Sequence, residues 1–221
     1  MAPPDDKRLP RFNFVLRGAL MLGGTGTDKL TCEGDCSGLF TPAGVDYDHK
    51  LGFGVGADFL WGLGSLVRLG PGIMYVAPND VDVGDVDSSY GIGSDFSLNF
   101  VFELTPRVGE NVYIVPRAQL GFLLLFLGDD LDAARDRTQR DCETAGFSGC
   151  ENLDGARPGF DFGIGAGVLV DVGPVRVRGD LMAQFYAINL YTLELSGIGV
   201  SSRLSENLSG VRYFFMAGVE F

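Results

Sequence analysis

The sequence lacks an apolar run long enough for a transmembrane helix. The longest such run, Leu120–Leu127, contains a glycine and falls far short of the roughly 20 residues that a spanning helix needs. Yet hydrophobic residues make up 46% of the 221 residues, and the 33 glycines are about twice the ordinary share. Abundant apolar residues and glycines without a long apolar run predict an all-β protein rather than a disordered chain.

Positive charge is also scarce. The chain has 17 Lys and Arg against 29 Asp and Glu, which gives a formal net charge of −12. Such a chain has no basic field to attract phosphates, so nucleic acid is excluded as a partner.

Eight stretches alternate between apolar residues and polar residues or glycines with the period of a β-strand. They are Arg11–Gly23, Lys50–Gly62, Leu66–Val76, Asp95–Thr105, Val112–Phe126, Phe160–Val172, Val175–Ala187 and Ser209–Phe221. Each has about the length that a tilted strand needs to cross a bilayer.

The two phases of the alternation indicate which face meets lipid. The apolar phase is rich in phenylalanine, with aromatic residues near the segment ends. The other phase mixes single charges with many glycines, which suits the crowded interior of a small barrel better than a solvated face. We therefore predict a barrel with its apolar face outward, not a soluble sandwich with its apolar face inward.

Connector lengths support the same fold. Long connectors (24–49, 77–94, 127–159 and 188–208) alternate with short ones (63–65, 106–111 and 173–174). Outer-membrane barrels place long loops on one side and tight turns on the other. The prediction is an all-β, eight-stranded antiparallel up-and-down transmembrane β-barrel with four long extracellular loops and three short periplasmic turns. Residues 1–10 form a flexible N-terminal segment, residues 11–221 form the barrel domain, and both termini are periplasmic.

The ending of the chain carries a resemblance. Apolar residues alternate up to a terminal phenylalanine, at Tyr213, Phe215, Val219 and Phe221. Together with the alternation of long and short connectors, this ending resembles the small eight-stranded outer-membrane barrels, such as the OmpA transmembrane domain, OmpX and OmpW. The resemblance implies a bacterial outer-membrane location, contact with membrane lipid and lipopolysaccharide, and recognition by the barrel-assembly machinery. The start of the chain has no apolar core of a signal peptide, so it looks like a mature sequence with a new initiator Met.

Charged residues in the inward phase are the main site candidates. An eight-stranded barrel is only wide enough for side chains to fill it, and unpaired charges there would be strongly destabilising. We therefore predict a paired network that plugs the lumen, in preference to a gated or ion-selective pore. Its predicted members are Arg17, Asp58, Arg68, Glu103, Arg117, Asp161, Arg176, Arg178, Asp180 and Arg212, and Lys50, Asp171 and Glu220 share their phase.

The four cysteines fall in two local pairs, Cys32 with Cys36 and Cys142 with Cys150, both in polar, glycine-rich stretches. We predict two loop disulfides formed in an oxidising compartment. The alternative, a four-cysteine zinc site, would have to bring two distant loops together and is disfavoured.

Acidic residues alternate in the second long loop, at Asp80, Asp82, Asp85 and Asp87, with no base beside them. They are a weak candidate for divalent cations because the distal glutamate of a calcium loop is missing, so a solvated strand extension is the preferred interpretation. No other metal site is predicted. In the third long loop, Asp129–Arg137 is expected to form a short surface helix.

The last long connector continues the strand pattern beyond the bilayer. Tyr191, Leu193 and Leu195 keep the outward parity of Phe185, and the chain is expected to turn near Ser196 and Gly197. The return passes through Ile198 and Val200. This apolar hairpin has two interpretations that the sequence weighs equally: a docking edge for another protein, or packing against the neighbouring loops.

Two functions follow. The first is a non-enzymatic structural or interaction protein that presents disulfide-stapled loops to a protein partner or to a second copy of itself. The alternative, implied by the OmpW resemblance, is narrow passive transport of small or apolar solutes. No cofactor is expected. Lipid-modifying barrel enzymes need a histidine with a serine, but His49, the only histidine, has no His-x-Ser arrangement and is expected to be a solvated loop-end residue.

Overall fold

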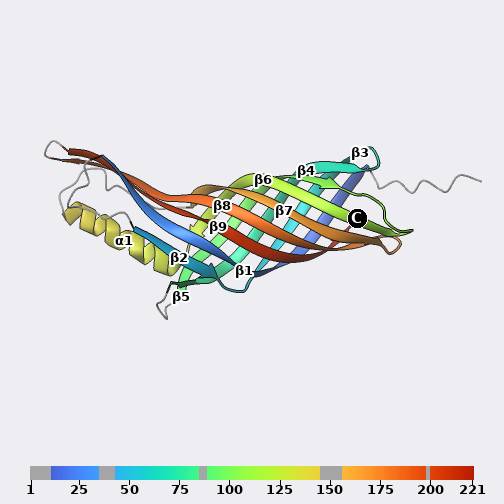
Figure 1. Ribbon diagram of the computed structural model, residues 1–221, viewed down its shortest axis with the longest axis horizontal. Coiled ribbons are helices and arrows are strands. Elements are labelled where there is room, and N and C mark those ends of the chain that lie inside the picture. Colours follow the sequence, from blue (N-terminus) through green and yellow to red (C-terminus); the bar gives the residue numbers. More distant parts are fainter. Residues whose placement is uncertain (1–10, 35–42, 85–88, 145–155, 198–199) are drawn as a thin grey trace, which may run out of the picture.

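The computed structural model describes residues 11–34, 43–84, 89–144, 156–197 and 200–221 (Figure 1). Eight of its strands form a closed ring: β1 (Phe12–Gly34), β3 (Gly52–Leu63), β4 (Val67–Val83), β5 (Ser89–Leu104), β6 (Val112–Leu127), β7 (Arg157–Asp171), β8 (Arg176–Gly197) and β9 (Val200–Glu220). Each strand runs antiparallel to the next, and β1 pairs with β9 to close the ring. The predicted eight-stranded up-and-down barrel is confirmed.

Two further elements lie at the long-loop end. The short strand β2 (Ala43–His49) pairs with both β1 and β4, so it continues the position of β3 in the wall. Helix α1 (Asp129–Thr144) follows β6. Three aspartates lie in its first turn, where the positive end of the helix dipole stabilises negative charge. This helix is longer than the sequence predicted. Within the described ranges, no helix is long and apolar enough to span a bilayer.

Apolar side chains cover the outside of the ring. Phe53 is 68% exposed, and Phe122, Phe160 and Leu181 are also exposed on the outer face. A soluble protein does not expose a continuous apolar band of this kind, whereas a transmembrane barrel turns such a band toward lipid. We call this band the apolar belt.

Glycines in the inward phase make room for charged side chains. A Cβ atom on Gly72 would lie 2.4 Å from Oδ1 of Asp58, and one on Gly167 would lie 2.1 Å from Oδ1 of Asp180. Both distances are far inside van der Waals contact. Glycine at these two positions is therefore required by the charges that fill the lumen.

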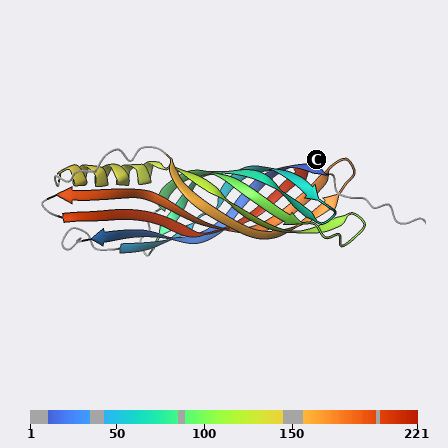
Figure 2. The ribbon, with the colours of Figure 1, turned by 90° about the horizontal axis from the view of Figure 1, so that it is seen from above.

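Several strands continue well beyond the apolar belt. The sequence predicted that the first strand ends near Gly23 and that the seventh ends near Ala187, whereas β1 reaches Gly34 and β8 reaches Gly197. Beyond the belt, β2, β1, β9 and β8 lie side by side in that order. With α1 they project from one end of the barrel, opposite the short turns (Figures 1 and 2). We call this part of the molecule the long-loop extension.

The long-loop extension has a hydrophobic core of its own, which explains why these connectors are ordered strands rather than loops. Its buried members include Tyr47, Val81, Leu190, Leu204 and Leu208, and Leu131 of α1 packs against them. The two hairpin strands β8 and β9 stay paired as far as Gly197 and Val200. Ser196 and Gly197, where the turn was predicted, are the last residues of β8, and residues 198–199 lie outside the described residues.

Candidate functional site

Paired charges fill the barrel interior inside the apolar belt, and we call this filling the charge plug. Among the described side chains, the ring strands bury six arginines and six carboxylates, whose formal charges cancel. They are Arg17, Arg68, Arg117, Arg176, Arg178, Arg212, Asp58, Asp95, Glu103, Asp161, Asp180 and Glu220. All of them lie on the inward phase of their strands.

Glu103 of β5 lies at the centre of the charge plug. Its carboxylate accepts hydrogen bonds from Arg68 of β4 at 2.7 Å, from Arg117 of β6 at 2.9 Å and from Arg178 of β8 at 2.9 Å. Each arginine also pairs with a second carboxylate, respectively Glu220 at 2.6 Å, Asp58 at 2.7 Å and Asp180 at 2.7 Å. The plug thus links strands on all sides of the ring through one carboxylate.

The remaining members extend the plug toward both ends. At the short-turn end, Arg176 pairs with Glu220 and donates to Oδ1 of Asn13 at 3.1 Å. Toward the long-loop end, Arg212 pairs with Asp95 at 2.5 Å and donates to Gln184 at 2.9 Å. Charges that are hydrogen-bonded on several sides can be buried without the full penalty of desolvation.

The structure brings together all ten charges that the sequence predicted for the lumen. Asp95 was missed, although its parity with Ser97 and Asn99 marked it as an inward residue. Two residues of that phase lie elsewhere. Nζ of Lys50 pairs with Asp82 at 2.8 Å in an exposed position, and Asp171 accepts from the backbone of Gly173 in a turn. Lys50 lies between β2 and β3, and Asp171 is the last residue of β7, so neither side chain faces the lumen.

His49 is not the solvated loop residue that the sequence suggested, because it is only 8% exposed. Its Nδ1 donates to Asn79 Oδ1 at 3.1 Å, and its Nε2 accepts from the Tyr186 hydroxyl at 2.6 Å. The Tyr186 oxygen lies 2.7 Å from that of Tyr47. Burial, and then the charge of Arg212, lower the pKa of His49 to about 4. A neutral aromatic layer therefore separates the charge plug from the core of the long-loop extension.

The acidic stretch of the second long loop does not form a metal site in the described residues. Asp80 and Asp82 are exposed on β4, while Asp85 and Asp87 lie outside the described residues. Contrary to the sequence analysis, a base does accompany this stretch, because Lys50 pairs with Asp82. Nowhere in the described ranges do three or more potential metal ligands cluster.

The prediction that Tyr191 belongs to an exposed partner surface is wrong, because this residue is only 7% exposed. The pairing of β8 with β9 shifts between Asn189 and Tyr191, so that consecutive residues Leu190 and Tyr191 are both buried. A β-bulge of this kind reverses the alternation, and the outward parity assumed from Phe185 fails beyond it. The side chains of Leu193, Leu195 and Val200 and the whole of Ile198 lie outside the described residues.

Of the four cysteines, only Cys32 has a described side chain, and its sulfur is not a free thiol. Cys36, Cys150 and the side chain of Cys142 lie outside the described residues. The two disulfide pairings therefore stay predictions. At the C-terminus, Tyr213, Phe215 and Phe221 are exposed on the outer face with Val219 half-buried beside them, as part of the apolar belt.

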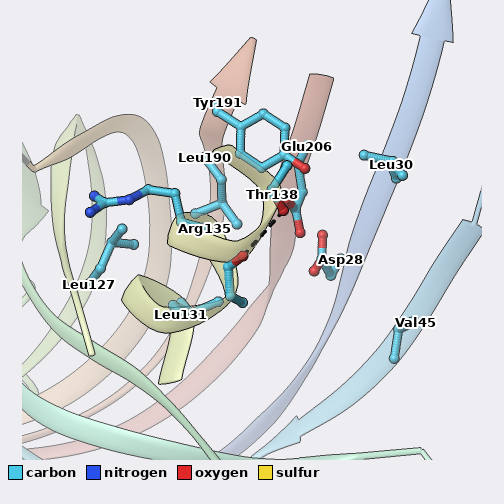
Figure 3. Close-up of a pocket in the computed structure, with 11 residues that line it drawn as sticks. Asp28, Leu30, Val45, Leu127, Leu131, Arg135, Thr138, Leu190, Tyr191 and Glu206 are labelled. Carbon is cyan, nitrogen blue, oxygen red and sulfur yellow. Dashed lines mark hydrogen bonds between the residues drawn. The ribbon is translucent and has the colours of Figure 1, made fainter. Parts of the chain in front are cut away.

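A cavity of about 220 Å³ lies between α1 and the sheet of the long-loop extension (Figure 3). We call it the helix-covered cavity. Most of its wall is apolar, formed by Leu30, Val45, Leu127, Leu131, Ala134 and Leu190. The helix is held over it by β5, because Asp130 accepts from the Gly91 backbone at 2.8 Å and from the Tyr90 hydroxyl at 2.9 Å.

Two carboxyl groups lie on the sheet side of this cavity. Asp28 of β1 and Glu206 of β9 approach the same space, with Tyr191 beside them (Figure 3). Burial, and then the nearby Glu206 carboxylate, raise the pKa of Asp28 to about 8. Burial and Glu206 also raise the pKa of Tyr191. The raised pKa keeps Asp28 protonated at neutral pH, and the tyrosine is neutral.

A closed ring of eight strands, apolar outside and filled with paired charges inside, defines a small outer-membrane-type β-barrel. Among solved structures, the chain is similar to the outer membrane protein OprG from Pseudomonas aeruginosa (14% identity, 95% of each chain, TM-score 0.44). It is also similar to Neisserial surface protein A (13% identity, 90% of this chain and 95% of that chain, TM-score 0.41). A third structure, outer membrane protein AlkL in DMPC lipid bilayers, is 12% identical over 99% of this chain and 93% of that chain (TM-score 0.42). No family model and no curated protein sequence matches the chain.

Proposed function

We propose that this protein is a closed, non-enzymatic outer-membrane barrel that presents its long-loop extension outside the cell as a protein-contact surface. In this orientation the short turns and both termini are periplasmic. The observation that carries the proposal is a free edge of β8: within the described ranges, no strand pairs with the outer side of β8 beyond Ile188. Residues 189–197 pair with β9 on one side, and β7 pairs with β8 only as far as Ile188.

A free strand edge presents unpaired backbone donors and acceptors that another strand can satisfy. Binding by strand addition uses such an edge, with main-chain hydrogen bonds for affinity and side-chain contacts for specificity. The buried core of the long-loop extension holds this edge in a defined position, so little conformational entropy has to be lost on binding. Disulfides at Cys32–Cys36 and Cys142–Cys150 would order the neighbouring loops further.

The charge plug supports a closed anchor rather than a channel. Side chains of Glu103, Arg68 and Arg178 are almost completely inaccessible to solvent, and both arginines bind Glu103 directly. An ion that crosses this layer would have to separate several buried ion pairs. The outward-facing residues Tyr213, Phe215 and Phe221 suit recognition by the barrel-assembly machinery during insertion.

Site-specific photo-crosslinking in intact cells tests the contact surface. A photoreactive residue in place of Asn189 or Arg203, both exposed on the β8–β9 hairpin, should give crosslinks to protein, either a partner or a second copy. The same residue in place of Glu110, exposed at the short-turn end, is the matched control. Crosslinks equal to this control, together with steady ion conductance of the wild type in planar bilayers, would replace the proposal with passive transport.

A further inference from the structure

The helix-covered cavity is not explained by anchoring or by the free edge of β8. An apolar void loses packing energy in proportion to its size, and a carboxyl group held away from water loses its hydration. This cavity has both features at one place. Oδ1 of Asp28 is shielded from solvent and accepts no hydrogen bond from any described residue.

The size of the cavity suits a small organic molecule. An apolar cavity of roughly 150 Å³ is large enough to hold one benzene ring. The helix-covered cavity, at about 220 Å³, has room for a ring or short alkyl chain and a short side arm. Val45 on its wall is 42% exposed, so the cavity reaches solvent beside β2.

The charges around the cavity select a cation. Asp28 and Glu206 supply two carboxyl groups. Among the described residues of the wall the one base is Arg135, which is already paired with Asp132 at 2.7 Å and Asp136 at 3.3 Å. The titratable groups that interact with Asp28 are Glu206, Tyr191, Tyr47 and Tyr90, and the guanidinium group of Arg135 points away from Asp28 (Figure 3). The tyrosines are uncharged at neutral pH, so they add no charge to that of the carboxyl groups.

We propose that the helix-covered cavity binds a small organic amine, with its ammonium group between Asp28 and Glu206 and its apolar body against Leu131 and Leu190. The ammonium group donates to the orphaned Oδ1 of Asp28 and takes the place of the proton that Asp28 otherwise carries. The apolar body fills the space under α1. This site shares Leu190 with the β8 strand of the protein-contact surface and adds a small-molecule ligand to it.

Binding of phenethylamine to the full protein in lipid nanodiscs, measured by isothermal titration calorimetry against empty nanodiscs, tests this proposal. We expect saturable binding at one site, and at least tenfold weaker binding of the neutral isostere 2-phenylethanol. Asp28→Asn should weaken amine binding at least tenfold and leave the alcohol unaffected. The matched control is Asp48→Asn, because Asp48 is an exposed acid on β2 outside the cavity.

A second variant and the number of protons released on binding show whether weaker binding in Asp28→Asn reflects the site itself or misfolding of the protein. Leu131→Phe fills the cavity and should weaken amine and alcohol alike, while barrel assembly is verified by heat-modifiable migration on gels. Amine binding at pH 7 should release close to one proton in the wild type, measured from the dependence of the binding enthalpy on the buffer, and none in Asp28→Asn. Equal binding of amine and alcohol, or amine binding that survives both variants, overturns the proposal.

Discussion

The charge plug makes a quantitative prediction at Glu103. This side chain is fully buried and binds Arg68, Arg117 and Arg178 at 2.7–2.9 Å. In Glu103→Gln the neutral amide replaces one negative charge among three arginines. Each arginine keeps one other carboxylate, but the plug then carries an uncompensated positive charge. Removing one partner of a buried ion pair costs about 3–5 kcal/mol, and we expect a loss of unfolding free energy in this range.

Urea titration of the protein in lipid vesicles, followed by heat-modifiable migration, measures this loss. Glu110→Gln is the control, because Glu110 is exposed in the β5–β6 connection and its replacement should change stability by less than about 0.5 kcal/mol. If Glu103→Gln unfolds at the same urea concentration as the wild type, the plug does not hold the barrel together. The ion pairs would then be a passive filling of the lumen.

Four further predictions concern other parts of the chain. Gly167→Ala should destabilise the barrel by about 1–3 kcal/mol because its Cβ meets Asp180, whereas Gly18→Ala, where nothing lies within 4 Å, should be neutral in the same urea titration. Leu204→Ala, at a site 1% exposed, should cost about 2–5 kcal/mol and raise hydrogen exchange in the long-loop extension more than in the ring. Because the pKa of Asp28 is raised to about 8, its stabilising effect is full at low pH and is lost as pH rises toward 8; urea midpoints at pH 5 and pH 8 should show this decline in the wild type and lack it in Asp28→Asn. Peptide mapping without reductant should find Cys32–Cys36 and Cys142–Cys150 bridges, and a bridge between the two loops would show the pairing wrong.

The ring and its interior could be predicted from the sequence because both depend on alternation within a strand. Phe53 and Val55 face outward for the same reason that Asp58 faces inward: successive side chains point to opposite faces. The partners of Glu103 could not be predicted in this way. They depend on the tilt and register of four separate strands, which a local pattern does not encode.

The sequence-based predictions fail where the alternation is broken. His49 is the last residue of β2, and residues 50–51 separate it from β3. The alternation of side chains along β3 therefore could not predict that His49 is buried. A single bulge after Asn189 turned Tyr191 inward. The helix-covered cavity was missed because Asp28 and Glu206 come from opposite ends of the chain, and only the pairing of β1 with β9 brings them together.

That pairing has a consequence for how the protein folds. The β1–β9 seam runs from the pair Val15–Glu220 to the pair Gly34–Ser202, so the wall is closed only by the two ends of the chain. Hairpins such as β8–β9 can form locally, but the seam has to wait for the last strand and for a large loss of loop entropy. Until then β1 and β9 are unprotected edges along their whole length, open to pairing with a wrong strand. The interval before closure is therefore the stage at which this chain most depends on assistance, and deleting either end would leave the wall permanently open.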